Sequence, residues 1–314
     1  DVNEVAQNMR RLDIPCDVIH FDIDYMDHYK VFTWNQERYH GKPEAFLEQL
    51  HGQGFKAVAI IDPGVKKEDG YDIYEQGIEK DYFAHDTAGQ VYENADWPGI
   101  SVFPDFGRDA VRRWWGENHE RLLQLGVNGI WNDMNEPASF NGPLPDDVVF
   151  YDEDMASTHR AMHNIYGHLM SKATFEGLKS LDERRPFVIT RACYAGSQKY
   201  TTVWTGDNHS LWAHLQMAVP QRCNMGLSGF SFVGTDVGGF SSDVTPELLV
   251  RWVQVGCFSP LFRNHSAAGS RRQEPWLFGQ EVLDIYRKYV QLRYTWIPYI
   301  YDLFFTGEVT GAPV

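Results

Sequence analysis

The chain has 314 residues, and its 43 acidic and 28 basic residues give a formal net charge of −15. A chain this acidic repels phosphate groups, so we expect neither nucleic acid nor an anionic membrane surface as a partner. Its apolar fraction of 43% is ordinary for a globular protein, and no apolar run reaches the roughly 18–20 residues of a membrane span.

The start of the chain and its cysteines bear on compartment. The chain begins at Asp1, without a methionine, inside a predicted amphipathic helix over 2–12. We therefore expect a fragment or mature segment, favour the cytoplasm, and leave the secretory pathway open. No cysteine pair has CxxC spacing, which argues against a zinc ribbon or a thioredoxin-type site. Free thiols are expected at Cys16, Cys193, Cys223 and Cys257.

Strands and helices alternate along the chain. A strand at 16–24, a helix at 43–52 and a strand at 56–64 favour parallel β/α architecture. Two stretches, 65–106 and 138–152, have no sustained period and are read as loops. The remaining predicted helices lie at 108–125, 154–180, 212–226, 246–255 and 280–305, and the remaining strands at 129–133, 186–192, 201–207, 229–236 and 256–265.

Nearly every predicted strand ends in a charged or polar residue. These residues are Asp22, Asp62, Asp133, Arg191, Asp207, Asp236 and His265. In a (β/α)8 barrel the carboxyl ends of the strands form the active site. A Rossmann-type sheet is the alternative, but no GxGxxG follows a strand. The sequence thus predicts an α/β fold, a (β/α)8 TIM barrel over 1–314, with 65–106 inserted as a subdomain on its rim.

The many aspartates raise the question of a metal. The segment 20–28 offers two histidines and three aspartates as ligands. Strand alternation would point Asp22, Asp24 and His20 to one face, with His20 deeper in the barrel. A compact metal site also needs several histidines at strand ends, and only His265 clearly qualifies. We therefore expect no metal and no other cofactor.

A paired-carboxylate reaction on a sugar fits the pattern better. Asp133 follows an apolar run in GIWNDMNEP (129–137), and Asp207 ends another in TVWTGDN (202–208). Each lies near a tryptophan, and two such carboxylates are the minimum for glycoside hydrolysis. A lone aspartate at a strand end is usually structural, but clustered like charges are costly unless function holds them together. No GxSxG or Cys-His signature supports a serine or cysteine nucleophile.

At these motifs the chain resembles glycoside hydrolase family 31, the retaining α-glucosidase family. GIWNDMNEP resembles its nucleophile signature, and the segment from Gly234 to His265 resembles its second signature. The resemblance extends over essentially the whole chain through HFDIDYMD (20–27), IIDPG (60–64), WPG (97–99), FPDF (103–106) and RPFVITRACYAGSQ (185–198). Thr235 and Leu261 are mild departures from the family pattern and leave the catalytic pair untouched.

The resemblance implies a role for each site residue. Asp133 would be the nucleophile and Asp207 the acid/base. Hydroxyl groups of the terminal glucose would be bound by Asp22, Arg191 and His265. Apolar walls would come from Ile23, Trp97, Trp131, Met134, Trp204 and Phe240, with Ile60 at the pocket floor and Asp236 and Arg263 supporting the polar network.

The resemblance also implies an activity. The expected function is an exo-acting retaining α-glucosidase that takes an oligosaccharide or α-glucoside. An α-xylosidase, an α-glucosyltransferase or an α-glucan lyase on the same scaffold is the alternative, and a non-catalytic sugar-binding protein is a second one. Family members also carry an N-terminal β-sandwich, the first barrel strand and C-terminal β-domains, which are expected to be missing here. The sequence decides neither which glycosidic linkage is preferred nor whether the chain forms a homo-oligomer.

Overall fold

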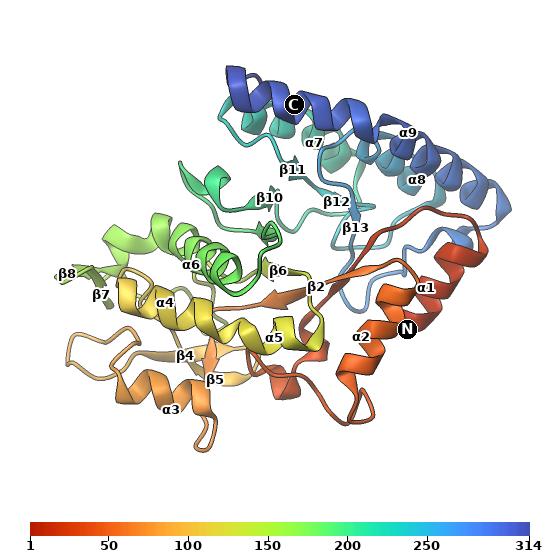
Figure 1. The fold of residues 1–314 in the computed structure, drawn as a ribbon. Coiled ribbons are helices and arrows are strands. Elements are labelled where there is room, and N and C mark those ends of the chain that lie inside the picture. The colour runs from red at the N-terminus through yellow and green to blue at the C-terminus, as the bar shows by residue number, and fades with distance from the viewer. The chain divides into compact units, whose positions relative to one another are not determined.

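The computed structural model describes residues 1–314, which divide into two compact units. The central unit is Val18–Thr201, and the terminal unit combines Asp1–Asp17 with Thr202–Val314. Within each unit, strands lead into helices and helices lead back to parallel strands (Figure 1). This alternation is the one that the sequence predicts.

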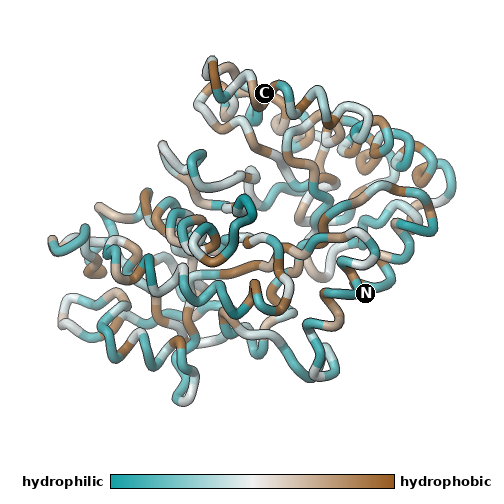
Figure 2. Tube along the Cα trace, viewed as in Figure 1, coloured by the Kyte–Doolittle hydropathy of each residue, from teal (hydrophilic) through white to brown (hydrophobic).

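The central unit is built on four parallel strands in the order β1-β2-β6-β9. The strands are β1 (Val18–Phe21), β2 (Lys56–Ile61), β6 (Gly129–Asn132) and β9 (Val188–Thr190). The connecting helices are α2 (Pro43–Gly52), α4 (Asp109–Asn118), α5 (Glu120–Leu125) and α6 (His159–Leu181). Strands β2 and β6 are buried along almost their whole length, and β2 is a hydrophobic stretch of the trace in Figure 2. Burial along the whole strand is typical of parallel strands covered on both faces.

Helices α4 and α6 pack closely because each carries a glycine at the contact. A Cβ built on Gly177 would lie 2.3 Å from the Cα of Gly116, so the two backbones approach where no side chain fits. The sequence predicts one helix over 108–125, but the structure has two, α4 and α5, divided at His119. The His119 ring is fully buried and burial lowers its pKa to about 4, while its Nδ1 lies 2.9 Å from the Trp115 carbonyl oxygen.

The stretch read as a loop over 65–106 is ordered into short elements. They are β3 (Val65–Lys66), α3 (Asp72–Glu79), β4 (Glu93–Asp96) and β5 (Gly99–Val102). The strands form an antiparallel sheet in the order β3-β5-β4. A hairpin of β7 (Val149–Asp152) and β8 (Met155–Thr158) also replaces the predicted start of the helix at 154. Strands of two to four residues are too short for a period to be recognised.

The terminal unit contains two parallel strand pairs and four helices. Strand β10 (Thr202–Trp204) pairs with β11 (Val233–Gly234), and β12 (Asp236–Val237) pairs with β13 (Arg263–Asn264). The helices are α1 (Val2–Arg11), α7 (Trp212–Leu227), α8 (Pro246–Gly256) and α9 (Gln280–Thr310). Trp252, Leu249 and Tyr286 lie in the core that α8 and α9 enclose. None of the helices combines the length and apolar character that a bilayer crossing requires.

Candidate active site

Asp133 stands where β6 ends, and its backbone is fixed from two sides. Its N–H donates to the carbonyl oxygen of Ile61, at the end of β2, over 3.2 Å. The preceding Asn132 is fully buried, and its Nδ2 donates to Thr174 Oγ1 on α6 at 3.2 Å. Met134, the next residue, has a φ of 53°, so the chain turns sharply after the carboxylate. The Asp133 side chain remains partly accessible, at 15% exposure.

Arg191 gathers the acidic groups around this strand end. It follows β9 directly, and its Nε lies 3.2 Å from Asp133 Oδ1. The same guanidinium donates twice to Glu136, with Nε at 2.9 Å and Nη2 at 3.0 Å, and Nη2 lies 3.3 Å from the sulfur of Met134. Sequence analysis assigned Glu136 no role, although it stands in the same motif as Asp133. Arg191 therefore orients protein groups as well as facing the site.

A cluster of three carboxyl groups, Asp62, Asp96 and Asp133, surrounds the same strand ends. Asp62 and Asp96 are 3% and 2% exposed. Burial raises the pKa of Asp62 well above its usual range, and Asp133 and Asp96 add to the effect. Burial also raises the pKa of Asp96 to about 7, with Asp133 adding to it and the Trp97 N–H and Arg191 opposing it. Asp96 lies in a segment without period, and sequence analysis missed it.

Aromatic side chains lie beside the cluster. Trp131 is 1% exposed, pairs in register with Ile60 of β2, and meets the His20 ring edge-on at 6.2 Å between centroids. Trp97 is 44% exposed and packs edge-on against Phe140, with ring centroids 5.0 Å apart. Trp97 thus offers an accessible ring, whereas Trp131 and Ile60 are almost fully buried beside the cluster.

Asp22 and Asp24 do not share a strand face, so the prediction from strand alternation is wrong for Asp24. The strand ends at Phe21, and Asp22 caps the 3-10 helix η1 (Ile23–Tyr25) by accepting the Ile23 N–H at 2.8 Å. Asp24 instead pairs with Arg38 at 3.2 Å.

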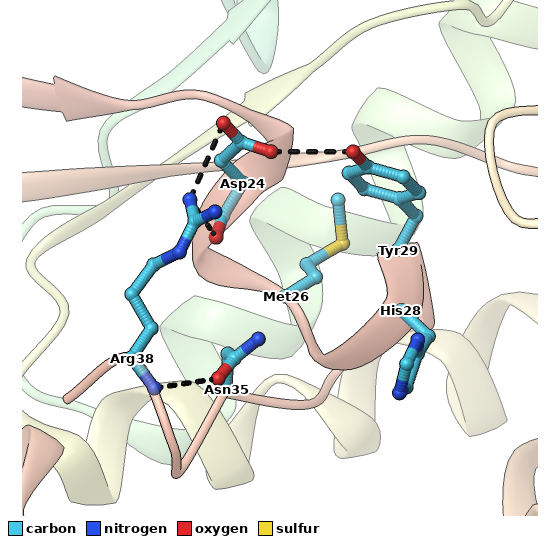
Figure 3. Close-up of a pocket in the computed structure, with 6 residues that line it drawn as sticks. All are labelled: Asp24, Met26, His28, Tyr29, Asn35 and Arg38. Carbon is cyan, nitrogen blue, oxygen red and sulfur yellow. Dashed lines mark hydrogen bonds and ion pairs between the residues drawn. The ribbon is translucent and has the colours of Figure 1, made fainter. Parts of the chain in front are cut away.

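Asp24 also accepts from the Tyr29 hydroxyl at 3.3 Å, on the wall of a small separate cavity of about 150 Å³ (Figure 3). The cavity is lined by Asp24, Met26, His28, Tyr29, Asn35 and Arg38.

In the terminal unit, Asp236 is the centre of a buried ion-pair network. It is fully buried, accepts from Arg263 Nη2 at 2.8 Å, and has His265 Nδ1 at 3.4 Å. Burial alone would raise the pKa of Asp236, but Arg263 and His265 outweigh it and lower the pKa. The Arg263 guanidinium lies 5.0 Å from the ring centroid of Trp204, and His265 packs against Phe240 at 5.0 Å.

Asp207 lies in the loop after β10 with an exposed side chain. The next residue, Asn208, anchors this loop. Its Nδ2 donates to Thr235 Oγ1 at 2.9 Å and to the Asp236 carbonyl at 3.0 Å, and its Oδ1 accepts the Phe240 N–H at 2.9 Å. Sequence analysis passed over Asn208 because an asparagine after a turn has no distinctive signal.

The structure thus brings the predicted residues together in two local sets. Around β6 lie Asp133, Met134, Trp131 and Arg191, and in the terminal unit lie Trp204, Asp236, Phe240, Arg263 and His265. No group of three or more His, Cys, Asp or Glu side chains is arranged to hold a metal ion. None of the four cysteines forms a disulfide.

Comparison with known sequences gives a consistent family. The model for the glycosyl hydrolases family 31 TIM-barrel domain matches residues 1–303. Alpha-glucosidase 2 of Bacillus thermoamyloliquefaciens is 50% identical over 100% of this chain and 40% of its own length. Neutral alpha-glucosidase AB of Homo sapiens is 40% identical over 100% of this chain and 34% of its own. The chain spans two fifths or less of these relatives.

Solved structures agree. A glucosidase II alpha subunit in its Glc1Man2-bound form is 36% identical, with a TM-score of 0.93, over 100% of this chain and 34% of its own. A Flavobacterium johnsoniae GH31 dextranase complexed with glucose is 31% identical, with a TM-score of 0.90, over 99% of this chain and 40% of its own.

Proposed function

Since the chain belongs to the glycosyl hydrolases family 31 TIM-barrel domain family, with the (β/α)8 barrel fold that the sequence predicts, we propose that it carries the catalytic pocket of an exo-acting retaining α-glucosidase. The observation that carries the proposal is the position of Asp133. It directly follows β6 with its backbone anchored, and its carboxylate contacts Arg191. The names of the relatives support an α-glucoside as the substrate.

The proposed reaction is a double displacement. Asp133 attacks the anomeric carbon as the bond to the leaving oxygen breaks, and Asp207 gives its proton to that oxygen. Asp207 then takes a proton from water, which displaces Asp133 from the β-glucosyl-enzyme. The guanidinium of Arg191 lies beside Asp133 and contacts the oxygen Oδ1 of its carboxyl group. In a retaining enzyme the two carboxyl groups stand about 5–5.5 Å apart, and we expect that separation.

The terminal glucose is held, in this proposal, by polar groups and walled by rings. Asp22, Arg191 and His265 bind its hydroxyls, and Asp236 and Arg263 hold His265 in place through their buried network. The walls are Ile23, Trp97, Trp131, Met134, Trp204 and Phe240, with Ile60 beneath. The segment 65–106, which carries Trp97, is proposed as a subdomain inserted at the barrel rim within a catalytic domain over 1–314.

A mechanism-based label tests the nucleophile. A 5-fluoro-glucosyl fluoride should form a stable ester with Asp133, and peptide mass spectrometry should locate it on the peptide around 127–140. Asp62→Asn is a matched control, because Asp62 is also a carboxyl group at a strand end. In this variant the reagent should still label Asp133. A label on the peptide that contains Asp207 would reverse the two roles.

Azide rescue tests the acid/base. Asp207→Ala should slow substrates with poor leaving groups far more than activated ones, because only the former need protonation. Added azide should restore turnover and yield the β-glucosyl azide. Equal loss on both substrates without rescue would rule out the role.

Product analysis separates the alternatives. A closed pocket should release glucose from maltoheptaose from the start, whereas early maltotriose and maltotetraose would indicate an open cleft. Faster cleavage of an aryl α-xyloside than of the glucoside would favour the α-xylosidase reading, and dominant transfer products would indicate a glucosyltransferase. An unsaturated sugar product would indicate a lyase, and the absence of any turnover would favour a non-catalytic sugar-binding protein.

The cytoplasmic location stays a prediction, and cell fractionation tests it.

A further inference from the structure

Asp96 is a buried carboxyl group that the reaction above does not use. It ends β4 and is 2% exposed. Its Oδ1 accepts the Trp97 N–H at 2.8 Å, whereas its Oδ2 is buried and accepts no hydrogen bond. A buried oxygen without a donor disfavours the charged form of a carboxyl group. Asp96 therefore has a structural reason to hold a proton.

Close packing fixes Asp96 against the segment that follows β2, the strand whose last residue, Ile61, contacts the Asp133 N–H. A Cβ built on Gly64 would lie 2.1 Å from Asp96 Oδ2, so the carboxyl group occupies space that only a glycine leaves open. Gly64 comes two residues after Asp62, whose Oδ1 is likewise buried without a hydrogen-bond donor. Ile61, just before, accepts the Asp133 N–H. Asp96 and Asp62 thus belong to the immediate surroundings of Asp133.

The charges in this region do not balance if every carboxyl group is ionised. The titratable and charged groups that act on Asp96 or respond to it come from four elements: Asp62 after β2, Asp133 after β6, Arg191 after β9 and Tyr166 on α6. Arg191 is the cation among them, and it already binds Glu136 and Asp133. One guanidinium that also binds the half-buried Glu136 cannot offset the charges of Asp62, Asp96 and Asp133, and burial with Asp133 raises the pKa of Asp96 to about 7.

We propose that Asp96 is a positioning residue that acts through Asp133: neutral at acid pH, it ionises as the pH rises, adds negative charge beside the nucleophile and extends the reaction into the alkaline range. This role rests on the proposed function. Attack disperses the charge of Asp133 while positive charge develops on the sugar, so a nearby anion favours the transition state.

Asp96→Asn tests the proposed role of Asp96 while keeping its hydrogen bond to the Trp97 N–H. An asparagine oxygen can still accept the Trp97 N–H, but the side chain cannot ionise. We expect kcat/KM on an aryl α-glucoside to match the wild type within about twofold at acid pH. Above neutral pH the variant should fall behind by about 3- to 10-fold, because it lacks the negative charge that Asp96 adds beside Asp133 in the wild type. A ratio of variant to wild type that stays constant across the whole range would overturn the proposal.

A second readout needs no turnover. Carboxyl ¹³C resonances of the full chain labelled at aspartate should include one that titrates near neutrality and is absent in Asp96→Asn. Asp133→Asn removes the neighbouring charge and should lower that midpoint. Loss of the resonance in Asp62→Asn alone would assign the proton to Asp62 and overturn the proposal. A chain with this titration but no hydrolysis of any glucoside would overturn the proposed function, and the kinetic role of Asp96 with it.

Discussion

Asp96 in the central unit and Asp236 in the terminal unit are both almost fully buried, yet their pKa values shift in opposite directions. Asp236 lies against Arg263 and His265, and these partners outweigh the cost of burial and lower its pKa. Asp96 shares its surroundings with other carboxyl groups and a single guanidinium. The difference shows that burial alone does not determine whether a carboxyl group is charged. The cations and carboxyl groups around it also contribute.

Removing Arg263 from its buried ion pair with Asp236 should have the largest effect on the free energy of unfolding. Arg263→Met leaves Asp236 buried without its main partner, which typically costs about 3–5 kcal/mol of the free energy of unfolding. Urea unfolding at neutral pH would measure the loss. Asp236→Asn combined with Arg263→Met should recover much of it. Arg113→Met, which breaks an exposed ion pair with Asp109, is the control and should change little. A comparable loss of stability in Arg113→Met would contradict the expectation that the buried pair of Arg263 and Asp236 matters more than an exposed pair.

The cluster of Asp62, Asp96 and Asp133 should make the free energy of unfolding depend on pH. The folded protein keeps a proton on Asp96 up to about pH 7, whereas the unfolded chain releases it near the ordinary aspartate pKa. The free energy of unfolding should therefore fall as pH rises between these values, by about 1 kcal/mol per pH unit from this group.

Asp96→Asn should remove that slope and gain stability relative to the wild type as the pH rises toward 7. Thermal unfolding of both proteins at a series of pH values checks this. A difference that does not vary with pH would mean that Asp96 is ionised throughout.

The close approach of Gly64 to Asp96 can be tested by adding one methyl group. Gly64→Ala places its Cβ on the Asp96 carboxyl group and should cost about 1–3 kcal/mol, as overpacking of a filled interior does. In an Asp96→Ala background the same change should cost much less, because the obstructing oxygen has gone. Chemical unfolding of the four proteins gives the coupling energy. If Gly64→Ala destabilised the wild type and Asp96→Ala equally, the added methyl group would not clash with the Asp96 carboxyl group.

The smallest effect is expected at Asp24, outside both networks. Its pair with Arg38 is exposed on both sides, with side chains at 64% and 53%. Such pairs contribute little, so Asp24→Asn should change stability by less than about 1 kcal/mol. Its kcat/KM should also stay near that of the wild type, whereas Asp22→Asn should lose activity. Both variants on the same aryl α-glucoside give the test. Similar losses of activity in the two variants would place Asp24 in the site beside Asp22.

The sequence predicted the features that follow strong periodic signals. Strands β2 and β6 each contain a short apolar stretch followed by an aspartate within two residues, so Asp62 and Asp133 could be placed at strand ends. Asp24 was misplaced because η1 begins directly after β1, and no pattern announces a 3-10 turn. Asp96 and Glu136 were missed because their importance comes from contacts between segments distant in sequence. The charge balance of a site depends on such contacts and cannot be read from any one motif.

The glycine pair between α4 and α6 limits how this sequence can change. Gly116 and Gly177 stand 61 positions apart in the chain, yet each occupies the space that a side chain on the other would need. A substitution at either position moves a whole helix, and α6 carries Thr174, which holds Asn132 beside the nucleophile. Enlarging one glycine alone would therefore be felt at Asp133. Substitutions at either glycine should therefore be tolerated only where they preserve the backbone contact, which links the packing of α4 and α6 to the surroundings of Asp133.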